Sequence, residues 1–305
     1  MKHAVSVSIG SSRRDKSVEI KLFGETVLLE RIGTDGDMQK AASLFREFDG
    51  KVDALGVGGT DLGLMVADHW YRLESVKHLV QDVHHTPVVD GTGLKTTLEY
   101  RAGKVVDEQL GSSLKGHRAL ITTATDRWGM ASGFLDRGYE MRYGDLMYSL
   151  GAPVMLRSAR MVKLLARILF PILGRVPFHW LYPTGAEQEK RTPRGEKYFL
   201  WADVIMGDCH YVRKYMPNRM DGKVVVTNTT TPEDTAIFRA AGVRHLVTTT
   251  PVLDGRSFGT NMMEAGIIAA TGRTEPVDYA HPGNYFTWMD SLVNQLGLNP
   301  QIHEI

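Results

Sequence analysis

The chain has 305 residues, of which 43% are hydrophobic and 23% charged, and its formal net charge at pH 7 is +1. These values are typical of a globular protein, and the near-zero charge excludes a general electrostatic attraction to nucleic acid. Cys209 is the only cysteine, which excludes an intramolecular disulfide, and no histidine spacing indicates a metal centre. We therefore expect no bound metal, and a small molecule as the partner.

The N-terminal residues 1–16 lack the long apolar stretch and cleavage site of a signal peptide. The longest apolar run, residues 164–174, contains Arg167 and Pro171 and falls short of the roughly 20 residues that span a bilayer. We expect a cytoplasmic protein without an integral membrane segment. The composition leaves a homo-oligomer open.

In the first part of the chain, apolar runs at residues 4–10, 52–59 and 87–90 each precede a polar or glycine-rich turn. Buried parallel strands have this character. A hairpin is predicted to turn at Gly24. Residues 37–50 have helical apolar spacing, with Asp37 as a candidate N-cap.

In the second part, five apolar runs alternate with helical segments, which predicts a parallel sheet built from βαβ units. Thr231 is a candidate N-cap for one of these helices, with Asp234 at the capping-box position. We predict an α/β protein of two units: a mixed-sheet substrate domain (1–112) and a Rossmann-like nucleotide- or ligand-binding domain (113–305). The predicted strands of the second unit cover residues 119–124, 139–144, 202–207, 223–228 and 244–250.

About 55 residues interrupt this alternation after residue 145, and they include a basic amphipathic helix near residues 158–175. Such a helix can lie on a membrane surface. It can also pack on a sheet and expose its arginines and lysines. We favour the second interpretation.

Most predicted strands end in hydroxyl, carboxylate or glycine residues. In open parallel sheets, ligands bind beyond the carboxyl ends of the strands, so these residues are candidates for lining a crevice. Small polar residues also cap helices and form turns, so each cluster alone has a structural interpretation. The clusters of the second unit include Asn228, Thr229, Thr230 and Thr249.

The segment "ALITTATDRWGMASGFLDRGYEMRYGD" has the layout of a dinucleotide site, with Asp145 placed 20 residues after Thr125, where an acid binds a ribose hydroxyl. The fingerprint G-x-G-x-x-G is absent, and only Gly129 could stand for one of its glycines. We predict NAD or NADP here, with NAD preferred. The residues assigned to the cofactor are Thr123, Thr125, Asp126, Arg127, Asp145, Asn228, Thr229, Thr230, Thr249, Ser257 and Thr260. The last two precede or open a helix, whose N-terminus favours an anion.

For catalysis, Lys95 and Asp90 flank a Gly-Thr-Gly turn after a strand, and a lysine beside a carboxylate can transfer a proton. Adjacent Arg13 and Arg14 could bind an anionic substrate. Both features also occur as solvated surface charges. The residues assigned to the substrate are Arg13, Arg14, Asp61 and Thr92.

The motifs "VSVSIGSSRRDK", "TDGD", "PVVDGTGLK", "WLYPTG", "VVVTNTTTPED" and "TTTPVLDGRSFGTNMMEA" together resemble a bacterial family usually labelled quinate 5-dehydrogenase. The resemblance covers residues 4 to about 270. It implies a substrate domain followed by a nucleotide domain and NAD(P)-dependent oxidation of a small polyhydroxylated carboxylic acid, such as quinate or shikimate. It also implies a catalytic lysine and aspartate, for which Lys95 and Asp90 are the nearest candidates. A non-redox transferase or lyase on a phosphorylated small molecule, and a non-catalytic ligand-binding protein, stay open.

Overall fold

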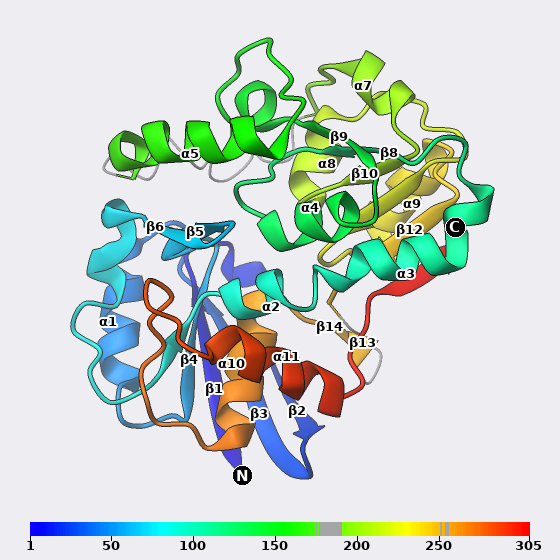
Figure 1. Cartoon of the computed structure of the whole chain (residues 1–305). Coiled ribbons are helices and arrows are strands. Elements are labelled where there is room, and N and C mark those ends of the chain that lie inside the picture. Colours follow the sequence, from blue (N-terminus) through cyan, green and yellow to red (C-terminus); the bar gives the residue numbers. More distant parts are fainter. Residues whose placement is uncertain (175, 177–190, 251, 254–255) are drawn as a thin grey trace.

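The computed structural model describes residues 1–305 except residues 175, 177–190, 251 and 254–255. Two sheets, each covered by helices, form two α/β units that lie one above the other (Figure 1). The predicted α/β class is confirmed. The carboxyl ends of the parallel strands in both units point toward the region between them (Figure 1).

The first sheet has the strand order β2-β3-β1-β4-β7 and is mixed, as predicted. Strand β1 runs parallel to β3 and β4, β4 parallel to β7, and β2 antiparallel to β3 through the predicted hairpin at Gly24. All five residues of β4 are buried, as expected of a strand covered on both faces. The bounds are β1 (Lys2–Ser8), β2 (Lys16–Leu22), β3 (Glu25–Gly33), β4 (Ala54–Gly58) and β7 (Val88–Val89).

The second sheet has the order β15-β12-β11-β10-β8-β9, with β15 antiparallel at one edge and the other strands parallel. The strand order reverses between β8 and β10, which is where doubly wound sheets bind ligands. All five predicted strands are confirmed. The bounds are β8 (Arg118–Ile121), β9 (Glu140–Tyr143), β10 (Val204–Met206), β11 (Val224–Thr227), β12 (His245–Thr248) and β15 (Gln301–Glu304).

Helix α1 (Met38–Phe48) begins after Asp37, whose side chain accepts from the Lys40 amide, as predicted. The capping box of α9 (Pro232–Ala240) is also present, with Thr231 and Asp234 exchanging hydrogen bonds. The other α-helices are α2 (Thr92–Thr96), α3 (Arg101–Leu110), α4 (Trp128–Leu135), α5 (Ala159–Leu173), α7 (Glu196–Trp201), α8 (Cys209–Tyr215), α10 (Thr260–Thr271) and α11 (Tyr285–Gln295). Shorter elements are η1 (Ser12–Arg14), η2 (Glu74–Leu79), η3 (Gly111–Ser113), η4 (Asp145–Ser149), β5 (Gly63–Val66), β6 (His69–Arg72), β13 (Val252–Leu253) and β14 (Arg256–Ser257).

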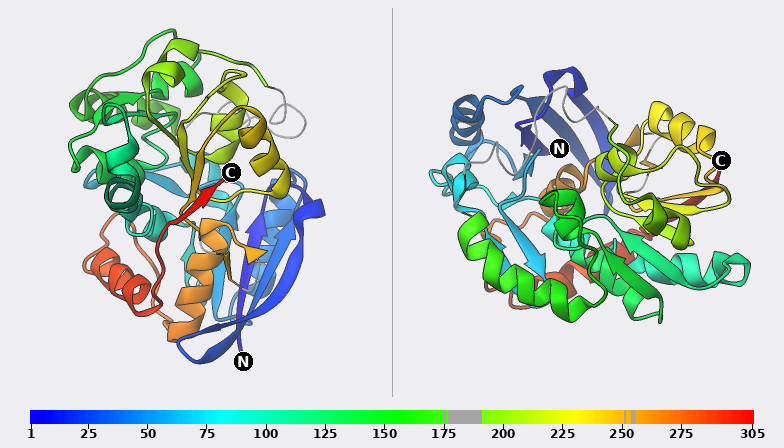
Figure 2. Two further views of the ribbon diagram at one scale, coloured as in Figure 1. Left: turned by 90° about the vertical axis from the view of Figure 1, so that its right-hand side faces the viewer. Right: turned by 90° about the horizontal axis from the view of Figure 1, so that it is seen from above.

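The chain crosses between the units a second time after β12. Helix α10 lies along the strands of the first sheet (Figure 2), and ten of its twelve residues are buried. Gly91 permits the close approach of the start of α10 to the turn before α2. Any other residue at position 91 would place a Cβ only 3.0 Å from the Asn261 backbone nitrogen. Helix α11 also packs on this unit, and β15 then returns to the second sheet. The division predicted at residues 112 and 113 does not anticipate this crossing, which assigns residues 258–298 to the core of the first unit.

Glu264 is a carboxyl group buried inside the first unit, below α2. It accepts hydrogen bonds from the Tyr279 hydroxyl (2.8 Å), the Tyr285 hydroxyl (2.6 Å) and the Leu94 amide (3.2 Å). Burial raises its pKa to about 7, because the hydrogen bonds only partly offset the cost of removing the charge from water.

This raised pKa predicts a stability that depends on pH. A carboxyl whose folded pKa exceeds its unfolded value stabilises the protein fully at pH values below about 4.5 and loses that stability as the pH rises through about 7. The difference corresponds to about 3 kcal/mol. Glu264→Gln should flatten this slope in denaturation experiments across that pH range. Glu275→Gln, at an exposed carboxylate, is the control and should leave the slope as in the wild type; equal slopes in all three proteins would contradict the prediction.

Candidate functional site

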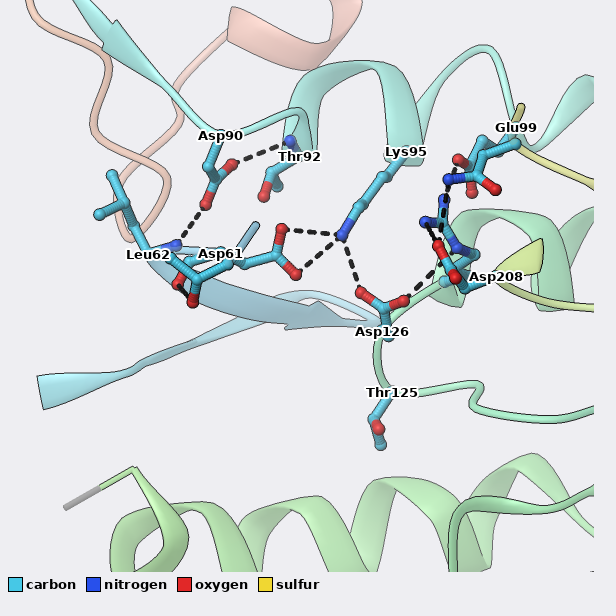
Figure 3. Close-up of polar contacts among 12 residues, drawn as sticks. Asp61, Leu62, Asp90, Thr92, Lys95, Glu99, Thr125, Asp126 and Asp208 are labelled. Carbon is cyan, nitrogen blue, oxygen red and sulfur yellow. Dashed lines mark hydrogen bonds and ion pairs between the residues drawn. The ribbon is translucent and has the colours of Figure 1, made fainter. Parts of the chain in front are cut away.

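Lys95 lies where the carboxyl ends of the two sheets meet. Helix α2 follows β7 directly and carries Lys95, whose Nζ donates to both carboxylate oxygens of Asp61 at 2.9 and 2.8 Å. It also donates to Asp126 at 2.8 Å. Asp61 follows β4 in the first unit and Asp126 follows β8 in the second, so one ammonium group joins the two units (Figure 3).

Arg127 extends this arrangement into the second unit at the reversal of strand order. Its guanidinium forms buried ion pairs with Glu99 and with Asp208, the latter at 2.9 Å, and its Nε lies 3.4 Å from Asp126. The arginine side chain is 5% exposed and that of Glu99 1%. We call the set Asp61, Lys95, Asp126, Arg127, Glu99 and Asp208 the charged cluster.

The charged cluster contains four carboxyl groups and two cations, and its low exposure makes their protonation states interdependent. Burial raises the pKa of Asp61 and of Glu99, although Lys95 and Arg127 oppose the two shifts. Burial also acts on Asp126, but there Lys95 and Arg127 prevail and the pKa falls. Two cations face four carboxyl groups, and Asp61 is the carboxyl for which burial and the neighbouring acids Asp126 and Asp90 favour a bound proton.

The two cations keep their charge. Burial lowers the pKa of Lys95, but Asp126 and Asp61 raise it more, and the result lies well above the ordinary value. Burial likewise lowers the pKa of Arg127. The carboxyl groups of Glu99, Asp126 and Asp208 raise it by more than burial lowers it. Lys95 is therefore a fixed cation, and Asp61 is the group of the pair that can exchange a proton.

Asp90, predicted as the catalytic partner of Lys95, has a different position. One of its oxygens accepts from the Leu62 amide at 2.8 Å and the other from the Thr92 amide at 2.9 Å (Figure 3). These bonds hold the loops after β4 and β7 together. The structure therefore places Asp61, not Asp90, against Lys95, because the backbone amides of Leu62 and Thr92 bind the Asp90 carboxylate.

Arg13 and Arg14 lie in the exposed turn η1, beyond the end of β1. Among the described contacts, neither arginine reaches the charged cluster. The neighbouring Asp15 pairs with Arg31 at 2.8 Å and thereby fixes the turn. The structure does not bring the predicted anion-binding arginines together with Lys95.

Asp145 follows β9 at the predicted position, but its carboxylate is already bonded. It accepts from the amides of Ala124 (3.2 Å) and Thr125 (2.8 Å) and from the Thr125 hydroxyl (2.8 Å). Those amides belong to the loop after β8, where a dinucleotide would place its pyrophosphate. A buried carboxylate at these amides would repel phosphate, so the loop in this conformation does not fit the expected cofactor.

The threonine-rich strand ends of β11 and β12 lie together. Asn228 donates to Asp208 at 3.1 Å, and Thr250 donates to the Asn228 carbonyl at 3.1 Å. Thr249 is buried, whereas Thr229 and Thr230 are half-buried. Asn228 therefore supports the charged cluster from the second unit.

The predicted anion site at the start of α10 is occupied by protein. Thr260 is buried against Gly91, and the Asn261 amide group donates to the Ser6 hydroxyl at 2.6 Å. Ser257 lies in β14, and its side chain is outside the described part of the structure. The "SFGTN" segment thus joins α10 to the first sheet.

A cavity of about 140 Å³ lies between helix α5 and the charged cluster. Asp126 borders this cavity and also a smaller hollow of about 10 Å³ beside Lys95. That smaller volume is close to the space one water molecule needs. Thr123, Thr125 and Asp145 line the larger cavity as well, so several predicted cofactor residues do border one space.

Helix α5 packs on both units: Val162 belongs to the hydrophobic core of the second sheet, in agreement with the favoured interpretation, and Ala166 contacts the β5–β6 hairpin of the first unit. Its outer face exposes both basic and apolar side chains. Met161 (46%), Leu164 (58%), Ile168 (55%) and Ile172 (65%) are the exposed apolar ones.

Within the described residues, no helix is long and apolar enough to cross a membrane, and no group of three acidic, histidine or cysteine side chains is arranged to hold a metal.

Sequence reasoning missed Glu99 and left Asp208 without a role. Glu99 lies four residues after Lys95 in a segment that is otherwise apolar or neutral. In a helix, this spacing of four residues would place Glu99 on the same face as Lys95, and it was the only indication in the sequence that Glu99 belongs to the site.

These features define a class: a two-unit α/β protein with a buried charged cluster between the carboxyl ends of two sheets. In sequence, residues 93–305 match the family described as "Domain of unknown function (DUF8754)", and the chain belongs to this family. Residues 3–90 match "Domain of unknown function (DUF8753)". The two matches meet at the Gly-Thr-Gly turn before Lys95. No curated protein matches the chain.

Several solved structures share the general architecture. The NAD-dependent malic enzyme of Thermotoga maritima is 14% identical, with 94% of this chain and 74% of that chain covered and a TM-score of 0.41. The malic enzyme of Entamoeba histolytica is 11% identical (98% and 64% covered, TM-score 0.40). GanP, a glucose-galactose binding protein from Geobacillus stearothermophilus, is 12% identical (99% and 97% covered, TM-score 0.37). At these values the likeness concerns the α/β fold alone.

Proposed function

We propose that this protein is an enzyme that transfers a proton at a hydroxyl or carbonyl oxygen of a small molecule, with Lys95 and Asp61 as its catalytic pair. The observation that carries the proposal is the position of Lys95. Its ammonium group is bonded to carboxylates of both units, at the strand ends where α/β proteins bind ligands, beside a cavity.

The two residues have complementary roles. Lys95, as a fixed cation, stabilises negative charge that develops on a substrate oxygen. Asp61, whose pKa is raised by burial, holds the proton that is given to or taken from that oxygen. Asp126 keeps Lys95 charged and directs its Nζ toward the hollow.

An NAD(P)-dependent oxidoreductase on a polyhydroxylated carboxylic acid is one form of this proposal. The resemblance to quinate 5-dehydrogenases supports it, and so does the strand–loop–helix layout around β8. Hydride transfer from an alcohol requires removal of the hydroxyl proton, which Asp61 can accept in its ionised form while Lys95 stays protonated. The bonds from Asp145 to the loop amides must then break when the nucleotide binds.

A non-redox enzyme, such as a lyase, is the second form, and the Asp145 contacts favour it. If the loop keeps the conformation described here, the site has no free amides for a pyrophosphate. The same charged cluster could then remove a proton next to a carbonyl group without a nucleotide. The packed start of α10 gives no support to a phosphorylated substrate at that place.

Thermal stability measured with NAD and NADP separately distinguishes the two forms. A ligand present at 100 times its dissociation constant should add about 2.7 kcal/mol of stability. A shift with either nucleotide, together with quinate-dependent formation of reduced nicotinamide, would support the oxidoreductase. No thermal shift with either nucleotide, together with no quinate-dependent formation of reduced nicotinamide, would exclude the oxidoreductase and leave the non-redox form.

A further inference from the structure

The cavity beneath α5 has an apolar wall and one polar end. Helix α5 supplies most of the wall, and Leu64 and Leu73 of the first unit and the segment after β9 supply the remainder. The residues that α5 contributes are Val162, Leu165, Ala166, Leu169, Phe170 and Leu173. Such a surface gives up its contact with water readily to an apolar ligand.

The size of the cavity limits what it can hold. Its volume of about 140 Å³ is close to that of an engineered cavity of about 150 Å³ in another protein, which binds benzene. A six-membered ring or a short hydrocarbon chain fits this space. A polyhydroxylated ring of the same size would leave several hydroxyl groups against leucine side chains, at a cost for each one without a partner.

The polar end faces the charged cluster. Thr123, Thr125, Asp126 and Asp145 meet there, with Ser149 and Tyr211 beside them. Thr123 is only 3% exposed, and its buried hydroxyl has no hydrogen-bond partner within the described structure. A buried hydroxyl without a partner indicates a place where a ligand or a water molecule supplies one.

The charges at this end select the kind of polar group. Two carboxyl groups, Asp126 and Asp145, border the cavity, and the pKa of Asp126 is held low by Lys95 and Arg127 against the effect of burial. A permanent carboxylate repels an anionic ligand. A hydroxyl or an amine can donate to Asp126 or Thr123.

We propose that this cavity is the substrate site and takes a compact amphipathic molecule: one apolar ring or short chain with a hydroxyl or amine at one end. The assignment rests on the proposed function in that it places the polar group beside Asp126 and hence near Lys95. It differs from the polyhydroxylated acid that the resemblance implies.

Benzyl alcohol, benzylamine, benzoate and quinate are suitable probes, with binding to the full-length protein measured by isothermal titration calorimetry. Leu169→Trp fills the cavity from a half-exposed lining position, and Ile168→Trp is the matched control on the outer face of the same helix. We expect benzyl alcohol and benzylamine to bind the wild type and the control alike, and Leu169→Trp at least tenfold more weakly. Benzoate and quinate should bind at least tenfold more weakly than benzyl alcohol.

Failure to detect benzyl alcohol binding to the wild type, or equal binding to Leu169→Trp, would overturn the proposal. Benzoate binding as tightly as benzyl alcohol would overturn the assignment of the polar end. Lys95→Met separates this inference from the proposed function, since the substitution leaves the apolar wall intact. If Lys95→Met binds benzyl alcohol normally and keeps its turnover, only the catalytic proposal is wrong. If Lys95→Met loses turnover but the wild type does not bind benzyl alcohol, only the cavity proposal is wrong.

Discussion

Replacing Lys95 with Met should lower turnover by roughly 10²–10⁴-fold, because the variant loses the cation that stabilises charge on the substrate oxygen. The methionine keeps most of the aliphatic stem. The substitution also leaves Asp61 and Asp126 without their shared ammonium partner, so a loss of stability accompanies the loss of activity. Turnover must therefore be expressed per folded molecule, with folding checked by circular dichroism at the assay temperature.

Lys104→Met is the matched control for this experiment. Lys104 lies on the neighbouring helix α3, its side chain is 59% exposed, and its nearest acid is Glu108 at 3.8 Å. Removing that charge should leave turnover within twofold of the wild type. If Lys95→Met, when folded, also stays within a few-fold, Lys95 has no catalytic role and the charged cluster only joins the two units.

Much of the fold could be predicted because its strands are short, buried and flanked by turn residues. Apolar periodicity located every strand of the second sheet except β15 and indicated the hairpin at Gly24. The crossing of α10 back to the first unit was not predicted, since alternation of strands and helices does not tell which sheet a helix covers. Apart from Glu264, the segment "MMEAGIIAA" is apolar on all sides, which is typical of a helix buried between other elements.

The candidate site shows the same limit. Lys95, Asp61 and Asp126 were each identified as strand-end residues. They are 31 to 65 positions apart in the sequence, and they meet only because the two sheets face each other. Asp90 and Asp61 both follow buried strands, and only the three-dimensional turn decides that Asp90 bonds to backbone amides. The spacing of Asp145 likewise fits a carboxylate that binds a ribose or one that binds the loop after β8, and the structure shows the second.

Arg127→Met should destabilise the protein by about 3–5 kcal/mol, the cost of leaving buried charges without their partner. Glu99, Asp208 and Asp126 all lose the same cation. The control is Arg137→Met, because that arginine is 37% exposed and lies 3.9 Å from its nearest carboxylate, Asp107. Its effect should stay within about 0.5 kcal/mol. Chemical denaturation of both variants and the wild type at neutral pH measures the difference.

The cost of Arg127→Met should also depend on pH, and the direction identifies the cause. Arg127 is the main group that opposes the burial-raised pKa of Glu99, so its removal raises that pKa further. A carboxyl with a raised folded pKa is stable in its protonated form at low pH and loses stability as the pH rises through that pKa. The difference between variant and wild type should therefore be small near about pH 4 and grow toward neutral pH.

The double variant Arg127→Met/Glu99→Gln cannot ionise at position 99 and should recover part of the loss at neutral pH. A cost that is the same at every pH, with no recovery in the double variant, would mean that Arg127 contributes packing and not charge compensation, and that Glu99 carries no charge in the folded protein.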